Sequence, residues 1–256
     1  MVVTLPQLYI FLLILARVAG IFFEAPVFGA RTFPSLAKTA LALWISLVLW
    51  STVPGPAPVF DSALVFALFV VKEFIIGFTI GFIAQIIFSA VQAAGDLIDL
   101  QMGMSIATIM DPTTGGIATI VGRLTFFIAL VVFLIVNGHH LILAGLHTSF
   151  KALPMAAPIN ISSAFISQIL ELGTTFWFIA IQLAIPAILL IFLSDFAFGI
   201  VSRVAPQVNV FMLGFQVKPS LGLIAILLSL PLLIGHIGQL VEQMGGEIFK
   251  LFVYLR

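Results

Sequence analysis

The four histidines are the residues that could bind a metal or a haem. His139 and His140 are adjacent, and His147 would share a helix face with His140, while His236 could contribute from a second helix. Such ligand sets usually need carboxylate or cysteine help and partners that orient the imidazoles. We therefore interpret these residues as helix-end histidines that meet headgroups or backbone, and we predict no metal and no cofactor.

Three carboxylates in apolar stretches, Glu73, Glu171 and Asp195, could instead carry protons or ions. That hypothesis describes a secondary transporter and predicts inverted repeats, none of which is evident. Glu73 is expected to have a buried partner. The neighbouring Lys72 points in another direction around a helix, so we predict that the two do not pair directly, and Lys72 could reach a membrane edge.

Signatures of enzymes are absent from the sequence. It contains no metalloprotease, nucleophile-elbow or phosphate-loop motif. The absence of cysteine excludes disulfides, cysteine-bound metals and thiol catalysis. The net charge is zero and no two basic residues are adjacent, which argues against nucleic-acid binding. We predict that the protein is not an enzyme and has no catalytic residue.

The composition indicates a membrane protein. Hydrophobic residues make up 62% of the 256 residues and charged residues only 8%, whereas soluble domains carry about 25% charged residues. One core could not bury so much apolar surface. The first apolar stretch lacks a preceding basic region and contains Arg17, so we interpret it as a permanent helix rather than a signal peptide.

The elements that must position these residues are about six apolar helical regions. They are 5–23, 36–53, 63–94, 124–146, 164–193 and 220–240. Some are short for a span of about 20 residues, and others are over-long and interrupted by polar residues or proline. Such interruptions at membrane depth are tolerated where the backbone is buried in protein. We therefore expect an all-α membrane protein with partly broken helices, packed inside an assembly, and a single domain over 1–256.

Gly77 and Gly81 share a helix face just after Glu73 and would let another helix approach closely. The contact could lie within the chain or against another subunit, and the sequence leaves both open. Arg203 and Lys218 flank an apolar helix–turn–helix junction. They could face an anionic lipid or an acidic neighbour, or simply solvent.

The stretch 95–122 is too polar and glycine-rich for a lipid-facing helix, yet too apolar for an ordinary surface loop. Its methionines, Met102, Met104 and Met110, are flexible side chains that suit changing partners, and Asp111-Pro112 favours a turn. The stretch could occupy a pore or be a re-entrant connector without a gating role.

Two blocks of the sequence are specific in their residue types and spacing. They are Gln101-Met102-Gly103 followed by Asp111-Pro112, and Ala205-Pro206-Gln207 followed by Asn209-Val210-Phe211. Glu73 with its two glycines, Ala94-Gly95-Asp96 and Asn137-Gly138-His139-His140 complete the pattern in order along nearly the whole chain. Together these motifs resemble the FliR family of flagellar type III export-gate subunits and its injectisome counterpart SctT.

The resemblance implies helical hairpins assembled into a helical export gate in the bacterial inner membrane, at the flagellar basal body and partly raised above the membrane plane. It implies FliP-like and FliQ-like partners, further FlhB-like and FlhA-like components, membrane lipid, and unfolded export substrates as cargo. It also implies a plug loop that blocks the closed channel. On this sequence the loop consists of Ile106, Ala107, Thr108, Ile109, Met110, Asp111 and Pro112. The alternatives are an injectisome subunit and a proton-coupled transporter.

Overall fold

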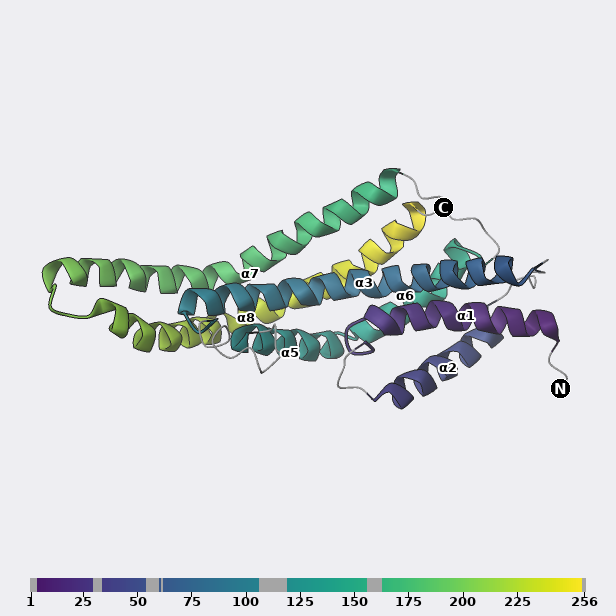
Figure 1. The fold of residues 1–256 in the computed structure, drawn as a ribbon, viewed down its shortest axis with the longest axis horizontal. Coiled ribbons are helices and arrows are strands. Elements are labelled where there is room, and N and C mark those ends of the chain that lie inside the picture. Colours follow the sequence, from purple (N-terminus) through teal and green to yellow (C-terminus); the bar gives the residue numbers. More distant parts are fainter. Residues whose placement is uncertain are drawn as a thin grey trace. The chain divides into compact units, whose positions relative to one another are not determined.

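The computed structural model describes residues 4–29, 34–53, 60, 62–105, 119–155 and 163–254. In these ranges the chain forms helices and no strand, as predicted. The helices are α1 (Leu5–Glu24), α2 (Ser35–Thr52), α3 (Ala63–Met102), α5 (Ile120–Ile135), α6 (Gly138–Ala152), α7 (Ser163–Val204) and α8 (Val210–Tyr254). Figure 1 shows their course from purple to yellow along the chain.

Three of these helices are longer and more regular than the sequence suggested. α3, α7 and α8 have 40, 42 and 45 residues and continue past the predicted ends at residues 94, 193 and 240. Pro186 lies inside α7, and Pro219 and Pro231 lie inside α8. At about 1.5 Å per residue these helices are roughly 60–68 Å long, about twice the 30 Å hydrocarbon core of a bilayer.

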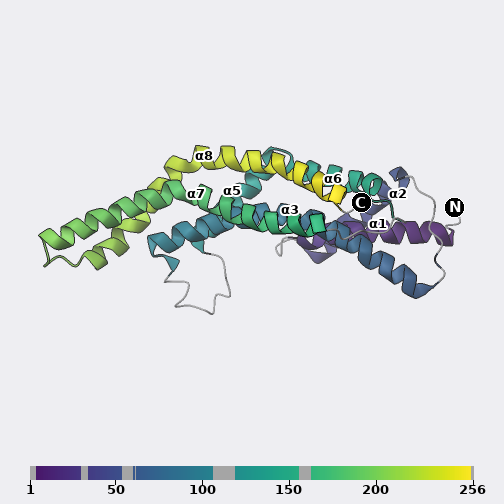
Figure 2. The same cartoon turned by 90° about the horizontal axis from the view of Figure 1, so that it is seen from above.

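The predicted region 124–146 is not one helix but a bent pair. α5 and α6 are bent by 67° at a short break between them. Figure 2 shows the same helices seen from above. Asn137, between them, has a φ of 57°, a left-handed conformation that asparagine tolerates better than most residues. The bend is therefore encoded by Asn137-Gly138, and it supplies the broken helix that the sequence led us to expect.

The chain divides into two compact units. The first contains residues 1–86, 134–172 and 241–256, and the second contains residues 87–133 and 173–240. α3, α5, α7 and α8 contribute to both, so neither unit is one continuous stretch of chain. The single domain over 1–256 stays a prediction.

Within the first unit, α1 and α2 pack against each other as a hairpin (Figure 1). α2 buries the stripe Ala42, Ser46 and Leu49, spaced as one helix face, and exposes large apolar side chains such as Trp44 and Val48. Within the second unit, α7 and α8 form a hairpin around the turn 205–209, and the apolar side chains Phe196, Phe211 and Leu228 are likewise exposed. Extended apolar exposure of this kind marks lipid or protein contacts.

Five helices in the described part of the chain are long and apolar enough to cross a membrane, and the bent α5–α6 pair makes up to six. The fold is thus an all-α membrane protein with about six apolar regions, in agreement with the sequence.

Candidate functional site

Arg17 of α1 and Glu73 of α3 form an ion pair in which neither side chain is exposed to solvent. Arg17 Nε donates to Glu73 Oε2 over 2.6 Å, and Nη2 lies 2.5 Å from the same oxygen. A buried charge is costly unless it is paired and hydrogen-bonded, and here both conditions are met. Arg17 is the buried partner that Glu73 was expected to have.

The remaining donors of Arg17 reach the last turn and the end of α6. Nη1 donates to Ser149 Oγ and Nη2 to the carbonyl oxygen of Leu153, each over 2.9 Å. The guanidinium also lies 4.0 Å from the centre of the Phe150 ring, a cation–π contact. One side chain therefore ties together α1, α3 and α6.

The prediction that Lys72 and Glu73 do not pair was wrong. Lys72 Nζ lies 3.2 Å from Glu73 Oε1 in an ion pair without hydrogen-bond geometry, and it also donates to the carbonyl oxygen of Met155 over 2.6 Å. Adjacent residues diverge around a helix, but the long lysine stem bends back far enough for its ammonium to reach the carboxylate. Glu73 thus faces two cations.

Glycines bring α1 and α3 into backbone contact beside this ion pair. A Cβ on Gly77 would overlap the carbonyl of Arg17, and one on Gly81 would lie 3.0 Å from Ala25 N and Ile21 O. On α1, a Cβ on Gly20 would collide with the backbone of Phe74 and Phe78. Of the two alternatives for Gly77 and Gly81, the structure describes packing within the chain.

α3 does not end at residue 94 but runs to Met102, eight residues into the stretch 95–122. Gly103, with a φ of 79°, closes it. Gly103 N donates to Leu100 O and Met104 N to Asp99 O, the paired bonds of a Schellman motif. Met102 is buried, and a Cβ on Gly222 of α8 would lie 2.5 Å from its Sδ. The first eight residues of the polar, glycine-rich stretch 95–122 therefore belong to the end of α3.

The seven residues of the predicted plug loop, 106–112, lie outside the described residues. The chain on both sides of them is held by Asp96 and Asp99 of α3. Asp96 accepts from Thr119 Oγ1 over 2.7 Å, and Asp99 accepts from Val121 N and Ser105 Oγ, each over 3.4 Å.

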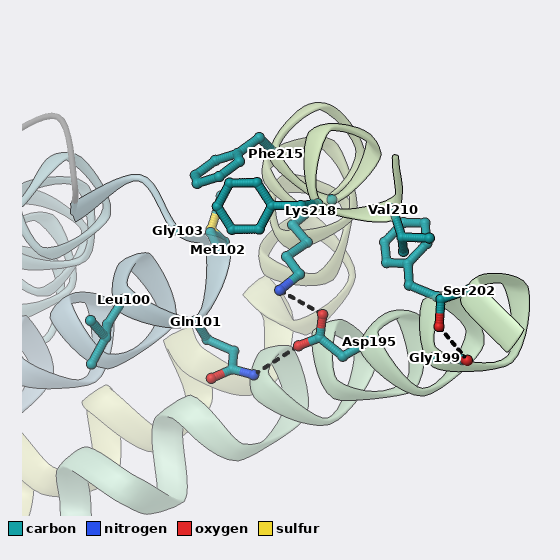
Figure 3. Close-up of a pocket in the computed structure, with 13 residues that line it drawn as sticks. Leu100, Gln101, Met102, Gly103, Asp195, Gly199, Ser202, Val210, Phe215 and Lys218 are labelled. Atoms are coloured by element: carbon teal, nitrogen blue, oxygen red, sulfur yellow. Dashed lines mark hydrogen bonds and ion pairs between the residues drawn. The ribbon is translucent and has the colours of Figure 1, made fainter. Parts of the chain in front are cut away.

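A cavity of about 600 Å³ lies in the second unit between the end of α3 and the α7–α8 hairpin. Figure 3 shows its polar side, where Lys218 Nζ lies 2.5 Å from Asp195 Oδ1 and Gln101 Nε2 donates to Asp195 Oδ2 over 3.4 Å. Phe198, Phe211 and Phe215 are among the apolar residues that line it. The cavity is large enough for a small ligand or a side-chain cluster.

The two basic residues of the predicted charged interface therefore differ. Lys218 is neutralised by Asp195 within the chain. Arg203 is exposed in the last turn of α7, where a cation is favoured by the helix dipole, and it forms no ion pair with a described residue. Of this pair, Arg203 is the residue whose charge is available to a lipid or partner.

Several carboxylates and histidines of the transporter and metal-site hypotheses have local partners. Glu73 and Asp195 are paired with cations, His236 contacts Gln182 over 2.8 Å, and the rings of His139 and His140 lie against each other. No group of three or more histidines and carboxylates in the described ranges could hold a metal ion.

The sequence profile of a family described as bacterial export proteins, family 1, matches residues 8–244. The chain belongs to this family.

Among its relatives in the bacterial export family is a flagellar biosynthetic protein FliR of Bacillus subtilis, 34% identical over 86% of this chain and 85% of that protein. The FliR of Escherichia coli K12 is 33% identical over 93% of this chain and 88% of its own length. The secretion system apparatus protein SsaT of Salmonella typhimurium is 34% identical over 73% and 70%. The predicted family resemblance is confirmed.

Sequence reasoning did not assign the pairing of Arg17 or the roles of Asp96 and Asp99 in this member of the export family. The sequence shows Arg17 inside the first apolar stretch. A charged residue at such a position usually pairs with another charged side chain or with backbone carbonyls. The two aspartates were noted only as parts of a motif. Their spacing of three residues, one helical turn, was the signal that both side chains leave α3 on one face.

Proposed function

We propose that the chain is a structural, channel-forming subunit of the flagellar type III protein export gate and has no enzymatic activity. The observation that carries this proposal is the family match over residues 8–244, together with FliR relatives that align over most of both chains. A multi-pass protein of the inner membrane, located at the basal body, fits the five or six apolar helices.

In this proposal the subunit assembles with FliP-like and FliQ-like chains, and with FlhB-like and FlhA-like components nearby. Two observations support an assembled state. α3, α7 and α8 are about twice as long as the hydrocarbon core is thick, so part of each must lie outside the lipid. Apolar side chains nevertheless remain exposed along α7 and α8, and outside lipid such faces need protein partners.

The proposed mechanism is steric. Residues 106–112 form a plug that seals the closed channel against ions and water, and an unfolded export substrate displaces it. On either side of the undescribed residues 106–118, Ser105 and Thr119 donate hydrogen bonds to Asp99 and Asp96 of α3. Energy comes from elsewhere in the apparatus, since the sequence shows no nucleotide-binding motif.

Purification in mild detergent followed by mass spectrometry tests the assembly. Co-purification with FliP-like and FliQ-like chains is the expected result. Recovery of the chain as a lone monomer that transports a solute after reconstitution would instead establish the transporter hypothesis.

The relative SsaT supports a second candidate, a subunit of an injectisome. The same experiment separates the two, because the co-purified chains belong either to a flagellar or to a virulence secretion system. SsaT aligns over less of both chains than the FliR proteins do, which favours the flagellar system.

A further inference from the structure

The last turns of α7 carry an open groove within the second unit. All the residues that line it belong to α7, between positions 192 and 204, and its volume is about 630 Å³. Phe192, Phe196 and Ile200 form its apolar walls, and each of these side chains is more than half exposed. Apolar surface of this kind marks a contact with lipid or protein. The groove therefore lacks a cover from the described part of the chain.

The groove follows one face of α7 and ends at a cation. Phe192, Phe196, Gly199 and Arg203 succeed one another at spacings of three and four residues, which place them on the same side of the helix. Gly199 leaves a gap in this row, since a Cβ there would meet nothing within 4 Å. From Phe192 to Arg203 the row is about 16 Å long, at about 1.5 Å per residue. The groove is thus elongated, apolar along its length and basic at one end.

Arg203 carries the uncompensated charge of the α7–α8 hairpin end. The charged residues between positions 195 and 218 are Asp195, Arg203 and Lys218, which leave one net positive charge. Asp195 also lines the groove, but its carboxylate is directed toward Lys218 and Gln101 (Figure 3). Arg203 forms no ion pair with a described residue. The charge that an occupant of the groove meets is therefore the guanidinium of Arg203.

The position of Arg203 along α7 corresponds to an edge of a bilayer. Residues 172–194 contain no charged side chain, and they extend about 35 Å, slightly more than the hydrocarbon core of about 30 Å. Arg203 follows this stretch, one residue before the end of α7 and the turn 205–209. Long basic side chains at such positions extend toward the headgroups. The groove thus runs from the headgroup level toward the hydrocarbon.

We propose that this groove binds one anionic phospholipid, with its phosphate on Arg203 and one acyl chain laid over Gly199. A guanidinium binds two phosphate oxygens in parallel, which gives the pair a defined geometry. An acidic helix of a partner subunit matches the charge, but with its side chains a helix is about 10–12 Å across. The gap at Gly199 is one side chain wide along the row, which suits a slender acyl chain. The inference requires only that α7 enters a membrane, so it does not depend on the proposed export function.

The first experiment measures lipid binding to the full-length protein, purified in mild detergent with any chains that accompany it. Native mass spectrometry follows titrations with phosphatidylglycerol and with phosphatidylcholine of the same acyl chains. One phosphatidylglycerol should bind saturably and about fivefold more tightly than phosphatidylcholine, the effect of one basic residue on an anionic lipid. Equal affinities would overturn the proposal. Glycerol phosphate, the headgroup without a tail, should not compete, and competition at the same concentration as the intact lipid would reject the acyl groove.

Two variants separate the contributions of charge and shape. Arg203→Gln should abolish the preference for phosphatidylglycerol. Gly199→Leu fills the gap without a clash and should weaken the binding of both lipids at least fivefold. The matched controls are Arg123→Gln, which removes an exposed arginine of α5 in the same unit, and Gly173→Leu, at another α7 glycine whose Cβ would meet nothing. A preference that survives Arg203→Gln, or equal losses in the controls, would overturn the proposal.

The second experiment locates the bound lipid. Because the chain has no cysteine, Val204→Cys places a single fluorophore at the groove and Val201→Cys places one outside its lining. In phosphatidylcholine vesicles with a tenth of brominated phosphatidylglycerol, quenching at position 204 should be at least twice that at position 201. Arg203→Gln should remove this difference. Equal quenching at both positions, or a groove covered by a co-purified protein and closed to lipid, would overturn the proposal.

Discussion

Arg17 and Glu73 are 56 residues apart in sequence and form an ion pair with both side chains fully buried. Because the same guanidinium binds Ser149 and the carbonyl of Leu153, the pair joins three helices of the first unit. Removing one partner of such a pair leaves an uncompensated buried charge, which is strongly destabilising.

Glu73→Gln should therefore destabilise the protein by about 3–5 kcal/mol. Denaturation of the purified protein in detergent, followed by circular dichroism, measures the change. Glu247→Gln is the matched control, because Glu247 pairs with the largely exposed Lys250 and such surface pairs contribute about 0–1 kcal/mol. A similar loss of unfolding free energy in the two variants would show that the burial of Glu73 does not make its ion pair more important for stability. The double variant Arg17→Met with Glu73→Leu should be more stable than Glu73→Gln, since the fully buried charge of Arg17 is removed together with its partner and Lys72 keeps its hydrogen bond to Met155 O.

Gly77→Ala should separate α1 from α3, because its Cβ would overlap the backbone carbonyl of Arg17, which cannot move aside as a flexible side chain could. We expect a loss of more than about 2 kcal/mol, in the range of overpacked cores. Gly173→Ala is the control, since a Cβ there meets nothing within 4 Å, and alanine in an exposed helix gains about 0.5–1 kcal/mol over glycine. Thermal unfolding in detergent should move in opposite directions for the two variants. A stable Gly77→Ala would refute the close contact.

Deletion of residues 106–110 should leave the gate assembled and make membranes leaky to small ions, because the plug is then missing. Co-purification of the partner chains reports assembly, and ion flux in cells or vesicles reports leakage. A deletion of equal length at residues 54–58 should not produce a leak. Normal ion tightness after the first deletion, with the gate intact, counts against the plug.

Lys218→Met should have only a small effect on stability, about 0–1 kcal/mol, because the Lys218–Asp195 pair is partly exposed and screened by solvent. Lys218→Asp with Asp195→Lys should restore part of whatever is lost. A double-mutant cycle in detergent measures this coupling. A coupling far above 1 kcal/mol would mean that the pair is shielded from water by something other than the chain itself.

The fold class followed from composition and apolar periodicity. The starts of α3 and α7 were predicted to within one residue, whereas α8 begins at Val210, ten residues before the predicted start at 220. The C-terminal ends of α3, α7 and α8 were not predicted, because residues that usually end a helix lie inside these helices. Pro186, Pro219 and Pro231 lie inside continuous helices, where neighbouring groups in a membrane protein can satisfy the freed backbone. Asn137-Gly138 did break a helix, through the left-handed asparagine, although the apolar run 124–146 continues across it.

Features of the candidate site could be predicted only where a single residue was enough to indicate them. Glu73 in an apolar helix implied a buried partner, but its identity as Arg17 depends on the crossing of α1 and α3, which no local pattern reveals. The hydrogen bonds that Thr119 and Val121 donate to Asp96 and Asp99 likewise join residues more than 20 positions apart in the sequence. Such contacts come from tertiary packing, for which one sequence contains no periodic signal.

The length of α3, α7 and α8 affects how stable a newly synthesised copy is in the cell before it assembles. A helix twice as long as the hydrocarbon layer cannot place all of its exposed apolar side chains in lipid. A copy synthesised without partner subunits would expose apolar side chains to water and become a substrate for chaperones and membrane proteases. In the proposed assembly, cellular quality control would thus match the amount of this protein to that of its partner chains.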